Sequence, residues 1–323
     1  MRMETVAEVE TKLRELAGVL LAEGKVDVVI GYERGTLPLR TTPCFIREAE
    51  AAGKLVWDAT CEHNLARYLR SQRGRVAIVA KGCDARAITV LLSERQLARD
   101  QLFIIGVACQ GVVDRRKVQA YLADRELQQA TLAGAQVVFG GEGWQESLPL
   151  KELLWDGCLT CRQHTPLLYD ALIGEPLPGD SEGALEEYAD VAALEAMTAD
   201  ERWAHFSSEL SRCLRCYACR QACPLCYCPE CFVDQTQPAW CGKTDETTDL
   251  ITFHIVRALH SAGRCADCGA CSRACPVGID LRSLNRKLIK DIKQWYGYEA
   301  GLDPDALAPL ATFRPDDPQE FIE

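Results

Sequence analysis

Hydrophobic residues near the N-terminus recur with the spacing of an α-helix. The apolar positions within residues 4–23 are Val6, Val9, Leu13, Leu16 and Leu20. Residues three and four apart share one face of a helix, so this stretch is predicted to be one amphipathic helix packed on a core. Gly24 follows, at a position where glycine often ends a helix.

Farther along the chain, short apolar runs alternate with stretches of helical spacing. The runs predicted as strands are residues 25–31, 54–60, 75–81, 101–109 and 135–140. The stretches predicted as helices between them are residues 62–72, 84–99 and 114–133. Strands that alternate with helices are typical of an α/β domain with a mostly parallel sheet. The loops at the strand ends of such a sheet are the expected place for a ligand.

From Trp203 onward, clusters of cysteine are separated by helical segments, of which residues 247–263 and 281–297 are the clearest. Before them, residues 163–201 contain ten Asp or Glu and no Lys or Arg. This composition is typical of a solvated connector, and a docking surface for a basic partner is the alternative. The predicted organisation is an α/β domain with its N-terminal helix (1–175), an acidic connector (176–202), a mainly α-helical domain (203–300) and a C-terminal tail (301–323).

Charge and hydropathy argue against several classes of partner. The 323 residues carry a net charge of −11, which argues against nucleic acid or an anionic membrane surface as the main partner. No apolar run approaches the ~18 residues that a membrane span needs. Residues 1–18 are charged and amphipathic, unlike a secretory signal. We therefore expect a cytoplasmic protein without a membrane span.

Eighteen cysteines are the unusual feature of the composition. In a reducing compartment, clustered thiols are expected to be metal ligands rather than disulfides. Two runs follow the pattern C-x2-C-x2-C-x3-C-P, the spacing with which bacterial ferredoxins hold [4Fe–4S] clusters. These runs are Cys213, Cys216, Cys219 and Cys223 with Pro224, and Cys265, Cys268, Cys271 and Cys275 with Pro276.

In such a run, three closely spaced thiolates bind one cluster and the fourth cysteine reaches the neighbouring cluster. We therefore assign one cluster to Cys213, Cys216, Cys219 and Cys275, and the other to Cys265, Cys268, Cys271 and Cys223. A zinc ribbon would show C-x2-C pairs instead. The largely helical stretch between the runs resembles the α-helical ferredoxin type of heterodisulfide reductase and succinate dehydrogenase iron–sulfur subunits. The resemblance implies electron transfer through clusters in series.

The remaining cysteines fall into three groups. A further [4Fe–4S] cluster or a structural zinc ion is predicted at Cys226, Cys228, Cys231 and Cys241, with free buried thiols as the alternative. A second group lies in strand-end loops and in a C-x2-C pair, where it could converge on one cluster: Cys83, Cys109, Cys158 and Cys161. The last two, Cys44 and Cys61, are expected to be buried thiols.

A cofactor phosphate is expected at two of the strand ends. No G-x-G-x-x-G motif follows a predicted strand, so the usual dinucleotide fingerprint is absent. A helix that begins near Asp84 would direct its positive end at a phosphate. The candidate cofactor-binding residues, each of which also fits a turn or surface role, are Gly31, Arg34, Lys81, Gly82, Asp84 and Arg86. The five histidines form no motif, and no catalytic residue is assigned.

Three segments, in order, resemble the coenzyme F420 hydrogenase/dehydrogenase beta subunit family. They are "KGCDARA" (81–87), "IIGVACQG" (104–111) and "WDGCLTCRQHTPLLYDALIGE" (155–175). The resemblance implies an α/β domain that binds FAD and passes electrons between FAD and an iron–sulfur cluster of the same domain. It also implies that the ligands of that cluster are Cys83, Cys109, Cys158 and Cys161. Many family members carry the ferredoxin module before the flavin domain, whereas here it follows.

The leading hypothesis is an electron-transfer subunit of a multi-subunit oxidoreductase that contains flavin and iron–sulfur clusters. FAD exchanges two electrons with a hydride carrier, F420 or NAD, and single electrons with two to four [4Fe–4S] clusters. The expected partners are subunits of a formate dehydrogenase, a hydrogenase or a heterodisulfide reductase-like enzyme. The alternatives are a flavin-free iron–sulfur adapter that joins two partner enzymes and a zinc-rich interaction module without a redox role.

Overall fold

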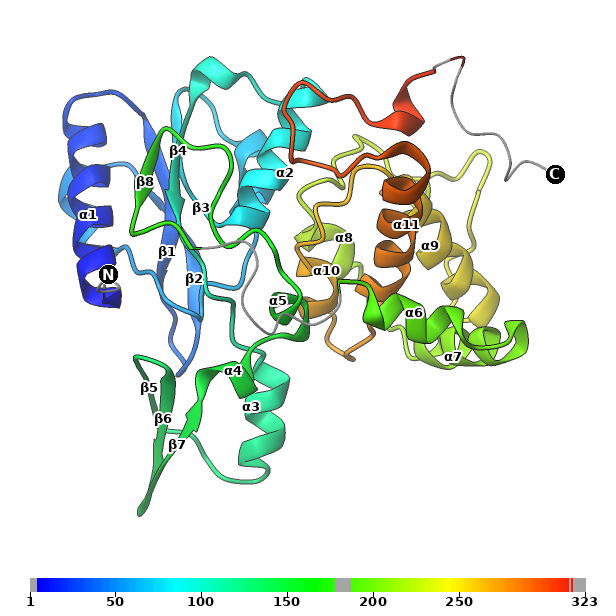
Figure 1. The fold of residues 1–323 in the computed structure, drawn as a ribbon, viewed down its shortest axis with the longest axis horizontal. Coiled ribbons are helices and arrows are strands. Elements are labelled where there is room, and N and C mark those ends of the chain that lie inside the picture. Colours follow the sequence, from blue (N-terminus) through cyan, green and yellow to red (C-terminus); the bar gives the residue numbers. More distant parts are fainter. Residues whose placement is uncertain (1–4, 178–186, 314, 316–323) are drawn as a thin grey trace. The chain divides into compact units, whose positions relative to one another are not determined.

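The computed structural model describes residues 5–177, 187–313 and 315. The chain divides into two compact units, which are described separately (Figure 1). The N-terminal unit contains residues 1–85 and 97–185, and the C-terminal unit contains residues 86–96 and 186–323. Residues 178–186 of the predicted connector, and residue 314 and residues 316–323 of the predicted tail, lie outside the described part of the chain.

A five-stranded sheet forms the centre of the N-terminal unit, with strand order β2-β1-β3-β4-β8 (Figure 1). The strands are β1 (Val28–Arg34), β2 (Thr41–Ile46), β3 (Val76–Ala80), β4 (Leu102–Val107) and β8 (Ala171–Ile173). Strands β1 and β2 pair antiparallel, whereas the other three pairs of this sheet are parallel. The predicted α/β class with a mostly parallel sheet is therefore confirmed for this unit.

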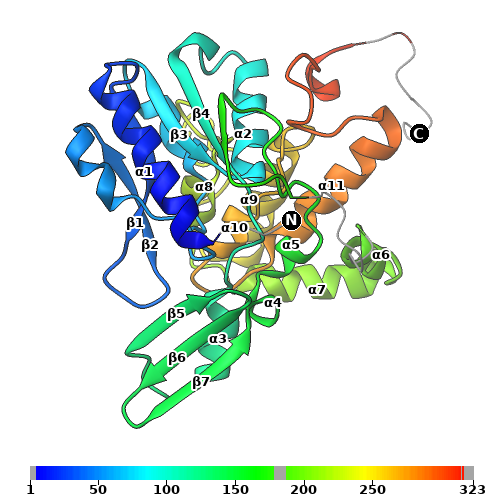
Figure 2. The ribbon, with the colours of Figure 1, turned by 60° about the vertical axis from the view of Figure 1, so that its left-hand side comes forward.

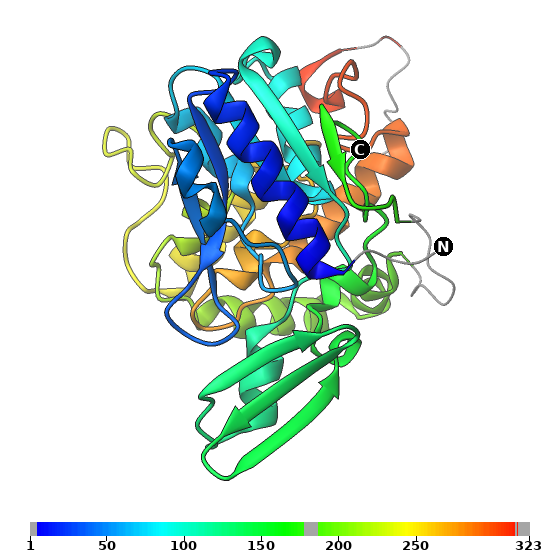
Figure 3. The same ribbon diagram turned by 90° about the vertical axis from the view of Figure 1, so that its left-hand side faces the viewer.

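Helix α1 (Val6–Ala22) lies across one face of this sheet (Figure 3). It begins with a capping box in which Thr5 and Glu8 satisfy each other's backbone amides. The stripe expected from the sequence buries Leu13 and Leu20 together with Ala17. Helix α2 (Gly82–Ser93) follows β3. The unit also contains three short 3₁₀ helices: η1 (Ala49–Lys54), η2 (Leu65–Ser71) and η3 (Arg99–Gln101).

Two predictions for this sheet were wrong. Residues 54–60 are not a strand, although Leu55 and Val56 are buried; this apolar stretch is a loop, and the Val56 N–H donates to Tyr32 O (2.9 Å). Its residues are apolar because they are buried, not because they pair in the sheet. The edge strand β2 was missed, and Pro43 within it is compatible only with an edge position.

A second, three-stranded antiparallel sheet packs on α3 (Arg115–Leu122) within the same unit (Figure 2). Its strands are β5 (Gln129–Ala133), β6 (Gln136–Gly141) and β7 (Trp144–Pro149). The helix predicted over 114–133 ends early, at Ala123, whose φ of 51° is not helical. The strand predicted over 135–140 exists as β6, but it belongs to this second sheet. The short helices α4 (Leu150–Leu153) and α5 (Asp156–Leu159) follow.

The C-terminal unit is mainly helical, as predicted. Its elements are α6 (Ala189–Glu195), α7 (Ala199–Ser211), α8 (Ala218–Ala222), α9 (Thr247–His260), α10 (Ala270–Arg273), α11 (Leu281–Tyr296) and η4 (Pro309–Ala311). Helices α9 and α11 correspond to the two stretches of helical spacing. Among the described residues, no helix combines the length and apolar character needed to cross a bilayer.

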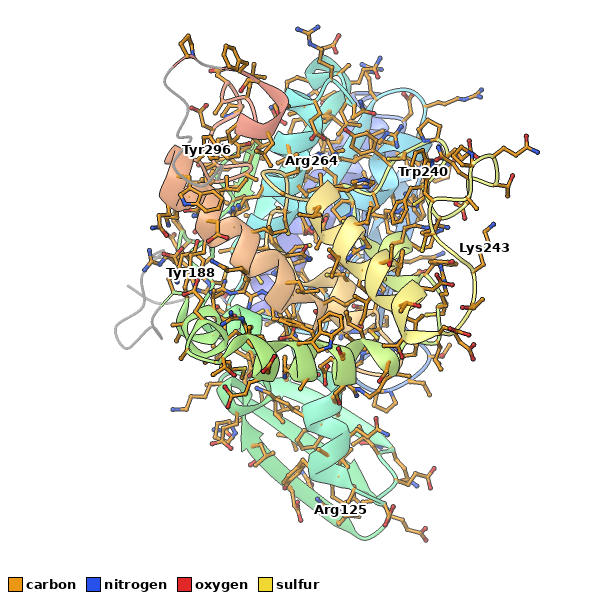
Figure 4. All side chains as sticks on the ribbon, turned by 90° about the vertical axis from the view of Figure 1, so that its right-hand side faces the viewer. Arg125, Tyr188, Trp240, Lys243, Arg264 and Tyr296 are labelled. Carbon is orange, nitrogen blue, oxygen red and sulfur yellow. The ribbon has the colours of Figure 1, made fainter. Side chains whose placement is uncertain are left out.

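The acidic stretch before these helices is not a purely solvated connector. Glu195 of α6 forms ion pairs with Lys287 and Lys290 of α11. The Arg286 guanidinium of α11 lies 5.0 Å from the ring centroid of Tyr188, which Figure 4 labels at the edge of the unit. These contacts attach the acidic residues to the basic face of α11.

Candidate functional site

The two cysteine runs of the C-terminal unit share one backbone conformation. In the first run, Arg215 and Tyr217 have φ angles of 53° and 58°. In the second run, the equivalent Asp267 and Gly269 have φ angles of 52° and 65°. Each loop leads directly into a short helix, α8 or α10. Left-handed residues curl a loop so that successive N–H groups face one concavity, which suits anionic ligands.

Backbone amides of these loops donate hydrogen bonds to the thiol sulfurs. The N–H of Arg215 lies 3.3 Å from the Cys213 sulfur, and the N–H of Ile279 lies 3.4 Å from the Cys275 sulfur. Such bonds stabilise a thiolate and are among the factors that set the potential of an iron–sulfur cluster. The repeated sequence pattern therefore corresponds to a repeated site geometry.

The thiols of the two runs interlock. Cys213 interacts electrostatically with Cys275 and Cys216, and Cys219 interacts with Cys271 of the second run and with Cys213. In the other set, Cys268 interacts with Cys223 and Cys271, and Cys265 interacts with Cys268 and Cys271. The last thiol of each run therefore interacts with thiols of the opposite run, Cys275 with Cys213 and Cys223 with Cys268 and Cys271. The assignment of one cluster to each quartet stays a prediction.

The surroundings of these thiols fit a cluster whose metal ions hold the sulfurs as thiolates. The two quartets border an apolar core that includes Leu210, Phe253 and Ile279. Burial raises the pKa of Cys219 to about 12 and that of Cys268 to about 11, so positive charge is needed to hold them as thiolates. No three of the described His, Cys, Asp or Glu side chains converge on a single metal ion. The all-thiol donor set of the two quartets is that of a [4Fe–4S] cluster.

The four surplus cysteines occupy different surroundings. Cys226 forms a hydrogen bond with Cys223, which lowers the pKa of Cys226 and, together with burial, raises that of Cys223. Cys241 accepts a hydrogen bond from Arg215 (3.4 Å). Cys231 interacts with Arg220, and Cys228 is exposed. A separate metal site for these four stays a prediction; the proximity of Cys226 to Cys223 follows from the C-x2-C spacing of the two.

In the N-terminal unit, the second group of cysteines gathers at the carboxyl ends of β3 and β4. Cys109 interacts electrostatically with Cys158 and Cys161, and Lys81 interacts with both Cys83 and Cys109. The sulfurs of Cys109, Cys158 and Cys161 each accept a backbone N–H at 3.4 Å, from Gly111, Val112 and Gln163.

Gly82 permits this convergence. A Cβ on Gly82 would overlap the carbonyl oxygen of Gln163, so only glycine allows the loop of Cys83 to pass this close to the segment after Cys161. The four thiols have the same donor chemistry as the C-terminal quartets, and they also fit an iron–sulfur cluster.

Most of the residues expected to bind a phosphate have structural partners. Lys81 is 2% exposed; its ammonium group lies 2.9 Å from the Asp84 carboxylate and also bonds to Tyr32 Oη and to the His63 carbonyl (2.8 Å). Within the C-terminal unit, Arg86 donates to the carbonyl of Ala300 (2.8 and 2.9 Å).

The two glycines of this set have packing roles. Gly31 lies inside β1, where a Cβ would overlap the Leu55 side chain. Gly82 fits against Gln163, as described above. Of the six candidates, Arg34 has the most accessible side chain, and it pairs with Asp58.

Two neighbouring hollows lie in the N-terminal unit, the first of them beside the cysteine group. The first has a volume of about 140 Å³ and is lined by Cys109, Gly111, Trp57 and Asp58, among others. The second, of about 290 Å³, is lined by Arg34, Arg40, Asp58 and Thr60, among others. Three residues line both hollows: Val6, Asp58 and Leu132. Sequence patterns missed these hollows because their walls are far apart along the chain.

Known proteins match this chain over both units. A family model for the C terminus of the coenzyme F420 hydrogenase/dehydrogenase beta subunit matches residues 73–187. The F420-dependent formate dehydrogenase subunit beta of Methanocaldococcus jannaschii is 24% identical, over 90% of this chain and 91% of that protein. The F420-dependent formate dehydrogenase 1 subunit beta of Methanococcus maripaludis is 23% identical, over 89% of each chain.

A solved structure also matches in part. A chain of the F420-reducing [NiFe] hydrogenase complex from Methanosarcina barkeri is 16% identical, with a TM-score of 0.38, over 50% of this chain and 64% of that chain.

The match over residues 73–187 includes the whole cysteine group of the N-terminal unit. Together with the α/β fold around this group and the interlocked thiols of the helical unit, it defines the chain as part of an oxidoreductase. Over residues 73–187 the chain is similar to the coenzyme F420 hydrogenase/dehydrogenase beta subunit family, and over nearly its whole length it is similar to the two formate dehydrogenase beta subunits.

Proposed function

We propose that this chain is the electron-transfer beta subunit of an F420-dependent oxidoreductase complex, in which electrons pass between FAD and a series of [4Fe–4S] clusters. One observation carries the proposal: Cys109 is at once a member of the N-terminal cysteine group and a wall of the neighbouring cavity. A cofactor in that cavity would lie directly against the cluster site. The two interlocked quartets of the C-terminal unit supply the next two sites.

The cavity offers FAD both apolar and charged walls. Trp57 and Val107 line the part next to Cys109, and Arg34 and Arg40 line the part next to Asp58. We assign the two arginines to the pyrophosphate, because guanidinium groups bind phosphate oxygens in pairs. FAD supplies the conversion between a two-electron hydride transfer and single-electron steps. Lys81, buried and paired with Asp84, keeps the loop of Cys83 in place instead of binding the phosphate.

F420 is the hydride carrier that we favour over NAD. Both formate dehydrogenase relatives are named F420-dependent, and each matches about nine-tenths of this chain. For the same reason, the partner that we favour is a formate dehydrogenase subunit, ahead of a hydrogenase or a heterodisulfide reductase-like subunit. We place the complex in the cytoplasm, where the thiols of the cysteine runs stay reduced.

The first test is a measurement of iron, zinc and flavin on one sample of the chain purified without oxygen. One FAD with about 12 Fe per chain would match three clusters, and about 16 Fe would add a fourth at the surplus cysteines. Iron without flavin would overturn the flavin site and favour the adapter function. Zinc near one per chain would place that metal at the surplus cysteines.

A second test addresses the carrier and the cavity. The loaded chain should oxidise reduced F420 with an artificial one-electron acceptor, and reduced NAD much less. Arg34→Ala should weaken FAD binding without loss of iron, because Arg34 lines the cavity and pairs with Asp58 rather than with a cysteine. Equal rates with both carriers would contradict the assignment of F420.

A further inference from the structure

One buried cation stands out in the C-terminal unit. Arg257 of α9 is 6% exposed, and its guanidinium donates a hydrogen bond to the Cys219 carbonyl (3.2 Å). Within the described part of the chain, its Nε–H has no hydrogen-bond partner. Among the described residues, no carboxylate forms an ion pair with it. A buried guanidinium without a counter-ion is costly, so other negative charge must stabilise it.

The other buried arginines of this unit have carboxylate partners. Arg86 lies 3.7 Å from Glu299, and Arg282 lies 2.6 Å from Asp267. Arg286 also pairs with Asp267 (2.7 Å). Arg257 therefore differs from them not in burial but in the kind of group that balances its charge.

Sulfur atoms of both quartets surround Arg257. Burial acts to lower its pKa, but the charges of Cys271, Cys223, Cys219 and Cys226 together raise that pKa above its ordinary value. Cys219 belongs to the first quartet, whereas Cys223 and Cys271 belong to the second. The guanidinium also donates a hydrogen bond to Cys271. Arg257 thus lies between the two sites and interacts with ligands of each.

We propose that Arg257 is a positioning residue that raises the reduction potentials of both C-terminal clusters. The inference rests on the proposed function. A site that accepts one electron from its neighbour gains one negative charge, which the adjacent guanidinium stabilises. Because arginine does not lose its proton in proteins, this effect is present at every working pH. A single cation shared by both sites affects both potentials in the same direction.

The test uses the full chain, loaded with iron and titrated with dithionite while the clusters are followed by electron paramagnetic resonance. In Arg257→Gln, both C-terminal clusters should shift to more negative potentials at unchanged iron content, and the N-terminal cluster should not shift. Arg257→Lys keeps the charge and should stay close to the unaltered chain. The matched control is Lys290→Gln, which removes a cation of the same unit that pairs with Glu195.

Unchanged potentials in a fully loaded Arg257→Gln chain would overturn the inference. If that variant loses iron, Arg257→Lys decides. Full iron and near-normal potentials in the lysine variant support the role of the charge, whereas lost iron or a negative shift there contradicts it. Absence of iron from the unaltered chain would overturn the proposed function and this inference together. Full iron with potentials that do not change in Arg257→Gln would overturn this inference alone.

Discussion

Cys275, the last thiol of the second cysteine run, lies beside Cys213, the first thiol of the first run. The reverse contact, between Cys223 and Cys268, joins the other pair of ends. Neither run can therefore complete its quartet alone. The helical segments between the runs, of which α9 is the longest, must fold before either site exists, so cluster binding and folding of the C-terminal unit are coupled.

Serine substitutions should reveal this exchange of ligands. Cys275→Ser should abolish the same spectroscopic signal as Cys213→Ser, and Cys223→Ser the same signal as Cys268→Ser. Each change should cost up to about 4 Fe per chain, because a hydroxyl is a poor substitute for a thiolate. Iron analysis with electron paramagnetic resonance measures both effects. If Cys275→Ser and Cys268→Ser abolished the same signal, the exchange would be contradicted. Cys44→Ser serves as the control and should retain all iron.

Gly82→Ala should disrupt the N-terminal cysteine group. The added methyl group overlaps the Gln163 carbonyl, a backbone atom that cannot move without shifting the segment after Cys161. We expect a loss of stability of about 1–3 kcal/mol and loss of the N-terminal cluster, with the C-terminal clusters intact.

Gly53→Ala is the matched control for this change, since a Cβ there meets no atom of the described residues within 4 Å. Thermal unfolding and iron content compare the two variants. If the Gly82→Ala chain kept its full iron content, the close approach would not be needed for the site.

Lys81→Met should destabilise the fold rather than weaken flavin binding. It leaves the fully buried Asp84 carboxylate without its cation, a change that typically costs about 3–5 kcal/mol. Urea unfolding measures this loss, and the flavin content of the folded fraction should stay unchanged. A stable variant that no longer binds FAD would instead restore the phosphate-binding role expected from the sequence.

His254 should make the C-terminal unit sensitive to acid. Burial, followed by the charges of Arg257 and Arg215, lowers its pKa from 6.5 to about 4. Above pH 6.5 the ring is neutral in both states and contributes nothing. Between pH 6.5 and 4 only the unfolded chain binds the proton. The free energy of unfolding therefore decreases as the pH is lowered, by about 3 kcal/mol in total.

His254→Phe tests this prediction, because neither ring nitrogen of His254 has a hydrogen-bond partner among the described residues to lose. The melting temperature of the variant should depend less on pH between 6.5 and 4 than that of the unaltered chain. Parallel curves for the two proteins would assign the acid sensitivity to other groups.

The local patterns of the chain determined much of this outcome. The spacing of thiols within each run and the apolar stripes of α1, α9 and α11 involve residues a few positions apart, where chain geometry alone fixes which side chains share a face. That spacing also predicts the exchange of the fourth cysteine, with which the contacts of Cys275 and Cys223 agree. Strands β1, β3 and β4 were predictable because each is a short, continuous apolar run.

Only the tertiary structure decided the surroundings of the charged groups. Tyr32, distant in the sequence, meets the local Lys81–Asp84 pair, and burial in the fold turns an apparent phosphate ligand into a structural ion pair. The cavity at Cys109 and the position of Arg257 between two cysteine quartets likewise depend on segments that meet only in the fold. Burial determines how strongly two charges interact, because it lowers the effective dielectric constant around them. Burial is a property of the packed chain, which no local spacing encodes.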